Sequence, residues 1–76
     1  MHIENLVYMI NQIESFYRSD PEQAVAVEGI RNHVRRFWEP RMRKAIIAHL
    51  ETGGAGLGEL SAMAVKLLAE EAAAVA

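Results

Sequence analysis

The sequence predicts an all-α domain of about four short helices, packed as a bundle or as an orthogonal array. In four separate segments apolar residues recur at steps of three and four, which is the spacing of one helical stripe. Proline and glycine clusters divide these segments. Strands are not expected, because no run alternates with period two and no Asn-Gly or Asp-Gly turn occurs. With 76 residues, the chain is expected to form one domain over residues 1–76.

The first helix is predicted before residue 20. Its inward stripe is expected to comprise Ile3, Leu6, Val7, Ile10, Ile13 and Tyr17, widened on one side by Met9 and Phe16. Four polar residues fall outside this stripe and are expected to face water: Asn5, Asn11, Gln12 and Glu14.

A second helix is predicted from about Pro21 to Trp38. Asp20 is placed to act as its N-cap, and Pro21 suits the first helical position because the missing N–H is not needed there. Gly29 lies inside this helix and costs about 1 kcal/mol relative to alanine, unless another backbone packs closely against it. The expected inward residues are Val27, Ile30, Val34 and Phe37.

Pro40 disfavours helical geometry at Glu39, so the second helix is expected to stop at this point. A third helix is predicted over residues 40–51 and ends at Gly53, since glycine readily takes the left-handed C-cap conformation. The fourth is predicted over about residues 58–73. The expected inward residues are Met42, Ile46, Ile47 and Leu50 in the third helix and Leu60, Ala64, Leu67 and Leu68 in the fourth.

The residue inventory argues against catalysis, so we predict no catalytic, cofactor-binding or metal site and no enzyme activity in this chain. There is no cysteine, and His2, His33 and His49 are too far apart to form a helical metal-binding pair. The glycine run 53–58 follows a helix and lacks the Gly-Lys-Ser or Gly-Lys-Thr ending of a phosphate loop. We interpret it as a helix–helix connection.

The expected localisation is cytoplasmic. No signal peptide is visible, and the longest uncharged stretch at the C-terminus is too short to cross a bilayer, so no membrane association is predicted. The lack of cysteine fits a reducing compartment.

The net charge of −2 is unevenly distributed, because six of the eight basic residues lie between Arg31 and Lys44. Tryptophan and arginine are enriched at interface hot spots, so this segment is a candidate docking surface. The predicted partner-binding residues are Arg35, Trp38, Glu39, Pro40, Arg41, Met42 and Arg43.

Three other interpretations of this basic patch stay open. Trp38 fills the corner between the second and third helices in one of them. In another the arginines are solvated, or paired with Glu28 and Glu39 at helical spacing. The third is a small nucleic-acid-binding module that uses the Arg31–Lys44 patch, although the acidic overall balance argues against it.

The order of motifs adds a resemblance. The informative stretches are Met9-Ile10-Asn11-Gln12-Ile13, Phe16-Tyr17, Phe37-Trp38-Glu39-Pro40-Arg41-Met42-Arg43, His49-Leu50 and Gly53-Gly54. Together they resemble the delta-subunit family of NAD-dependent formate dehydrogenases, over roughly residues 7–68. Two features depart from that family: Glu39 stands where aspartate is commoner, and Gly58-Glu59 where an aspartate–proline pair is common.

The resemblance implies an accessory subunit that assembles or stabilises a cytoplasmic formate dehydrogenase complex and docks on its large, molybdopterin-bearing alpha subunit. It implies no cofactor in this chain. A molybdenum or tungsten bis-pterin, iron–sulfur clusters, FMN and NAD are expected in the partner subunits. Whether the isolated chain forms a homodimer is left open.

Overall fold

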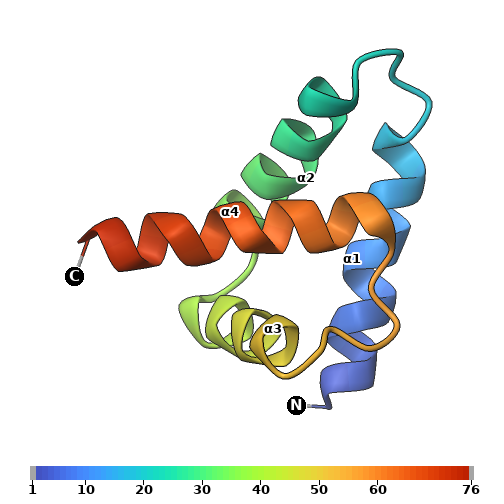
Figure 1. Ribbon diagram of the computed structural model, residues 1–76. Coiled ribbons are helices and arrows are strands. Elements are labelled where there is room, and N and C mark those ends of the chain that lie inside the picture. Colours follow the sequence, from blue (N-terminus) through green and yellow to red (C-terminus); the bar gives the residue numbers. More distant parts are fainter. Residues whose placement is uncertain (1, 76) are drawn as a thin grey trace.

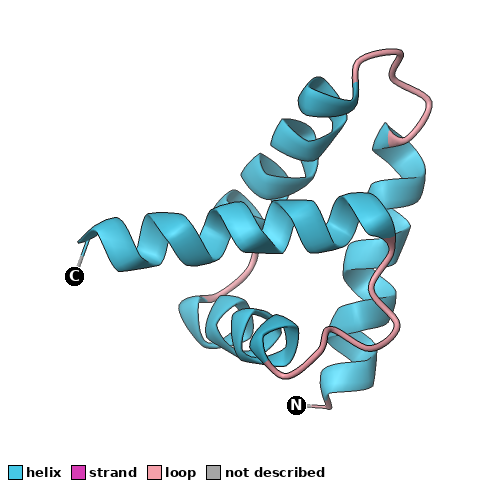
Figure 2. Ribbon diagram, viewed as in Figure 1, coloured by secondary structure: helices cyan, strands magenta, loops and turns pink. Residues whose placement is uncertain are grey.

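The computed structural model describes the backbone of residues 2–75 and the side chains of residues 2–74. It contains four helices, α1 (Ile3–Tyr17), α2 (Gln23–Phe37), α3 (Pro40–Glu51) and α4 (Glu59–Val75), and residues 2–75 include no strand (Figure 2). The predicted all-α class and the number of helices are therefore confirmed. None of the four helices combines the length and the apolarity that crossing a bilayer requires.

The helices form an array of crossing elements. Helices α1 and α2 lie side by side and are joined by a short connection, while α4 runs across them (Figure 1). Helix α3 packs against α4 and α1. Each helix thus buries one stripe against at least two others, as a small helical domain requires.

The core draws on all four helices. Its buried members are Leu6, Ile10, Val27, Ile30, Val34, Trp38, Ile46, Ala64, Val65 and Leu68. Most of the predicted inward stripes are confirmed, with three exceptions. Phe16 is 77% exposed, Phe37 is 66% exposed and Met9 is 38% exposed. Phe37 is the last residue of α2, where the chain turns and Trp38 takes the interior position instead.

Helix α2 begins later than predicted. Its N-cap is Glu22, with extended backbone angles, so the predicted N-cap at Asp20 is wrong and the helix starts two residues after Pro21. Asp20 Oδ1 accepts a hydrogen bond from the Glu22 backbone N–H at 2.9 Å. The bond joins the Asp20 side chain to the backbone two residues later, which is an Asx turn. This turn holds Pro21 outside the helix. The helix also ends one residue early, because Trp38 is extended.

The end of α3 has the predicted glycine cap. The Gly54 N–H donates to the His49 carbonyl at 2.9 Å, and the Gly53 N–H donates to the Leu50 carbonyl at 3.1 Å. Both glycines have positive φ, +116° and +64°. This pair of bonds is a Schellman motif, and it satisfies carbonyls that the helix itself leaves free.

Two polar residues of α1 that were expected to face water hold the glycine connection instead. Asn11 donates through Nδ2 to the Gly56 carbonyl at 2.8 Å and accepts the Gly58 N–H through Oδ1 at 2.9 Å. Glu14 Oε1 accepts the Ser61 N–H at 2.8 Å. These bonds pair backbone groups that the turn leaves without a helical partner, so α1 acts as the template for the start of α4.

Gly29 is covered by a side chain rather than by another backbone. A Cβ atom at this position would lie 2.6 Å from Cδ1 of Tyr17. The glycine therefore allows α1 and α2 to approach each other closely at this level.

Candidate partner-docking surface

Trp38 lies inside the protein, with 5% of its surface exposed. It occupies the corner between α2 and α3, as one of the open interpretations proposed. Arg43 closes this corner by donating from Nη1 to the Trp38 carbonyl at 2.6 Å. The tryptophan ring is therefore part of the core, and the residues around it form the outer surface of the corner.

The residues after Trp38 start α3. Glu39 is the N-cap residue, and its carbonyl accepts from the Met42 and Arg43 N–H groups at 2.9 and 3.1 Å. Its side chain makes no capping bond and is exposed. Pro40 is the first helical residue, a position that needs no N–H donor. Of the predicted partner-binding residues, Met42 packs on the core.

An ion-pair network ties α2 to α4. Arg31 contacts Glu28 at 2.5 Å and Glu71 at 2.6 Å, and Arg35 contacts Glu71 at 2.9 Å. The predicted pairing with Glu28 is confirmed. Glu71 was missed, because it lies 40 residues beyond Arg31 in the sequence and only the crossing of α4 over α2 brings them together.

The network also shifts the ionisation of Glu71. The hydrogen bond from Arg31 lowers the pKa of this carboxyl below its usual range; burial opposes the shift, and a further hydrogen bond from Arg35 supports it. Glu71 therefore carries its negative charge more firmly than an isolated glutamate.

Arg35 and Arg43 line the same hollow, which we call the corner groove. Its volume is about 360 Å³, and its lining comprises Arg35, Arg43, Ile47, Leu68, Glu71 and Ala72. The apolar members of this set come from α3 and α4. A surface of this kind, apolar and flanked by guanidinium groups, suits a protein side chain better than a reacting small molecule.

The remaining cations of the corner point to solvent. The Arg41 side chain is 77% exposed and lies 3.8 Å from Glu39, an exposed pair that contributes little. Lys44 is exposed and has no ion pair among the described residues. The basic patch is thus divided: Arg31, Arg35 and Arg43 bond within the chain, while the side chains of Arg36, Arg41 and Lys44 are exposed.

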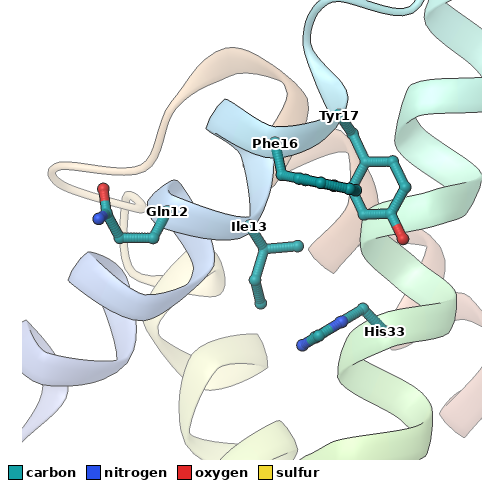
Figure 3. Close-up of a pocket in the computed structure, with 5 residues that line it drawn as sticks. All are labelled: Gln12, Ile13, Phe16, Tyr17 and His33. Carbon is teal, nitrogen blue, oxygen red and sulfur yellow. The ribbon is translucent and has the colours of Figure 1, made fainter.

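A second surface was not predicted from the sequence. A hollow of about 340 Å³ lies between α1 and α2, lined by Gln12, Ile13, Phe16, Tyr17 and His33 (Figure 3). The Phe37 ring lies 4.8 Å from the His33 ring and extends this surface. We call these six residues the aromatic face. The position of Phe37 at the last turn before Pro40 is the signal that could have placed it outside the core.

Within residues 2–75, no group of three or more His, Cys, Asp or Glu side chains is arranged to hold a metal ion.

Comparison with known proteins identifies the family. Neither the curated proteins nor the solved structures give a match. The family model for the NADH-dependent formate dehydrogenase delta subunit, FdsD, matches residues 5–65. This span includes α1 from Asn5 onward, α2, α3 and the first turns of α4, and therefore the whole corner around Trp38. The chain belongs to the family of NADH-dependent formate dehydrogenase delta subunits.

Proposed function

We propose that this chain is a non-catalytic accessory subunit that assembles or stabilises a cytoplasmic formate dehydrogenase complex by docking on its large subunit. The family membership carries the proposal. Under this proposal the partner subunits hold the cofactors: the molybdenum or tungsten bis-pterin, the iron–sulfur clusters, FMN and NAD. Formate oxidation takes place there, and this chain supplies a surface.

The corner offers the features that such docking needs. Arg41 and Lys44 present positive charge at exposed positions of α3, and the apolar lining of the corner groove can receive a side chain of the partner. Pro40 and the buried Trp38 fix the bend, so the backbone at the corner has little conformational freedom left to lose on binding. The expected partner surface is acidic around an apolar anchor, because complementary charge gives specificity and fast association.

The size of the chain supports the same role. A domain of 76 residues buries only about 60% of the surface that its unfolded chain exposes, so its own core gives a small stability margin. Domains of this size commonly gain stability from a partner.

The nucleic-acid-binding alternative has weaker support. Three of the six cations in the Arg31–Lys44 patch are bonded to carboxylates or carbonyls of the chain itself. Phosphate binding relies on cations that are free to replace the counterions of the nucleic acid. Fewer such cations remain than the sequence suggests.

The proposal is tested by expressing the large subunit with and without this chain. A tag on this chain should recover the large subunit in a fixed ratio. Without the chain, the large subunit should contain less molybdenum or tungsten, or should melt at a lower temperature. Unchanged metal content and melting temperature, with no co-purification, would exclude the accessory role.

A further inference from the structure

The aromatic face places two large phenylalanine rings in water. Phe16 is 77% exposed and Phe37 is 66% exposed, although neighbouring residues of both helices pack in the core. In Figure 3, Phe16 and His33 flank the hollow from α1 and α2, with Ile13 between them. Covering one such ring contributes about 1.5–3 kcal/mol. A surface of this kind on a small protein is typical of a binding site.

The aromatic face lies on the opposite side of α2 from the corner groove. Arg35 lines the corner groove, and Phe37, two residues later, belongs to the aromatic face. Two residues on a helix with 3.6 residues per turn are separated by about 200° around its axis. A partner seated in the corner groove therefore leaves the aromatic face uncovered.

The charge around the aromatic face restricts what covers it. None of its six residues is acidic, and the Arg36 guanidinium lies 5.5 Å from the centre of the Phe37 ring. Two acids of α1 and α2 serve other contacts: Glu14 bonds to α4, and Glu28 bonds to Arg31. A partner with a carboxylate beside its apolar groups would pair with Arg36, which has no ion pair among the described residues.

A second copy of this chain does not meet that requirement. A symmetric contact pairs the same patch on both subunits. Each patch would then bring Arg36 and no acid to the contact. Complementary charge therefore favours a different protein over self-association.

We propose that the aromatic face binds an amphipathic helix of another subunit, which places apolar side chains over Phe16 and Phe37 and a carboxylate next to Arg36. The hollow lies between α1 and α2, which pack against each other, and a third helix can fit such a shape by its apolar side. The chain then has two docking surfaces and joins two protein segments. This inference goes beyond docking at the corner and does not depend on it.

The test is site-specific photo-cross-linking in cells that express all the subunits. The photoreactive benzoylphenylalanine replaces Phe16 or Phe37, and a third variant carries it at Met63, which is 40% exposed on α4 and does not line the aromatic face. Cross-linked peptides are then sequenced. All three side chains are exposed, so a helical circular dichroism spectrum and an unchanged melting temperature are expected for each variant.

The proposal predicts that positions 16 and 37 capture the same segment of another subunit, with apolar residues at helical spacing and a carboxylate beside them. Position 63 should not capture this segment. Arg36→Glu should lower the yield of cross-linked product at position 37 by roughly tenfold. Cross-links to a second copy of this chain, to a segment without carboxylates or to no protein would overturn the proposal. Substitutions at Arg41 and Lys44 test the corner and leave Phe16, Arg36 and Phe37 unchanged, so each proposal is tested by its own variants.

Discussion

Glu14 on α1 accepts a hydrogen bond from the backbone N–H of Ser61 in the first turn of α4. The two residues are 47 positions apart, and the N···O distance is 2.8 Å. A carboxylate from one helix thus performs the role that an N-cap residue normally performs within its own helix. It also places negative charge at the positive end of the α4 dipole.

Glu14→Ala should therefore lower the free energy of unfolding by about 1 kcal/mol, the usual cost of removing a capping side chain. In a domain of this size, that loss corresponds to a fall in melting temperature of about 4–8 °C. Thermal unfolding followed by circular dichroism measures it. Glu70→Ala is the control, because Glu70 is exposed on α4 and makes no ion pair among the described residues. Equal melting temperatures for the two variants would show that the Glu14 bond contributes nothing.

Gly29→Ala tests the close approach of α1 and α2. In an exposed helix this change stabilises by about 1 kcal/mol. Here the new Cβ would lie 2.6 Å from Tyr17 Cδ1, so the ring must move, and overpacking of this kind typically costs about 1–3 kcal/mol. The expected net result is a lower melting temperature. In a Tyr17→Ala background the same substitution should become neutral or stabilising. An increase in melting temperature in the otherwise unchanged chain would contradict the packing.

The pH dependence of stability should carry a contribution from Glu71. Because its pKa is lowered in the folded state, its contribution is complete above the usual glutamate value of about 4.3. It is then lost as the pH falls through the lowered value. Glu71→Gln should consequently flatten the decline in melting temperature below about pH 4.3. Glu70→Gln, one position earlier, should keep the decline of the unmodified chain. Identical profiles for the two variants would exclude a special role for Glu71.

Alanine substitution of the two adjacent aromatic residues at the corner should change the free energy of unfolding by very different amounts. Trp38→Ala should cost about 3–5 kcal/mol, because it leaves a cavity in the core. For a domain with so little margin, this loss unfolds much of the population. Phe37→Ala, at an exposed position, should change stability by only about 0.5 kcal/mol. Urea unfolding measures both. A small loss for Trp38→Ala would place the indole outside the core.

Local rules account for what the sequence predicted correctly. The four helices, the start of α3 at Pro40 and its glycine cap depend on residues only a few positions apart. The contacts that sequence reasoning missed join distant segments: Glu14 to Ser61, and Arg31 to Glu71. Helical periodicity identifies an apolar stripe but not where a neighbouring helix stops covering it. For that reason Phe37 was assigned to the core.

The same limitation applies to the docking surface. Composition located the basic patch, but it could not separate Arg43, which donates to a backbone carbonyl, from Arg41, which is exposed and pairs only with the exposed Glu39. That distinction determines which substitutions are informative. Reversing the charge at Arg43 would disturb the corner itself, so it cannot report on docking alone.

The most direct measurement of the docking proposal is co-purification of the large subunit with an Arg41→Glu, Lys44→Glu variant. Both side chains are exposed, and an acid in the first turn of α3 suits the helix dipole, so the melting temperature should not fall. The control, Arg18→Glu with Lys66→Glu, changes the net charge equally at exposed positions outside the corner. We expect the corner variant to recover about tenfold less large subunit than the control. Equal recovery of the large subunit by the folded corner variant and the control would show that docking does not use the corner.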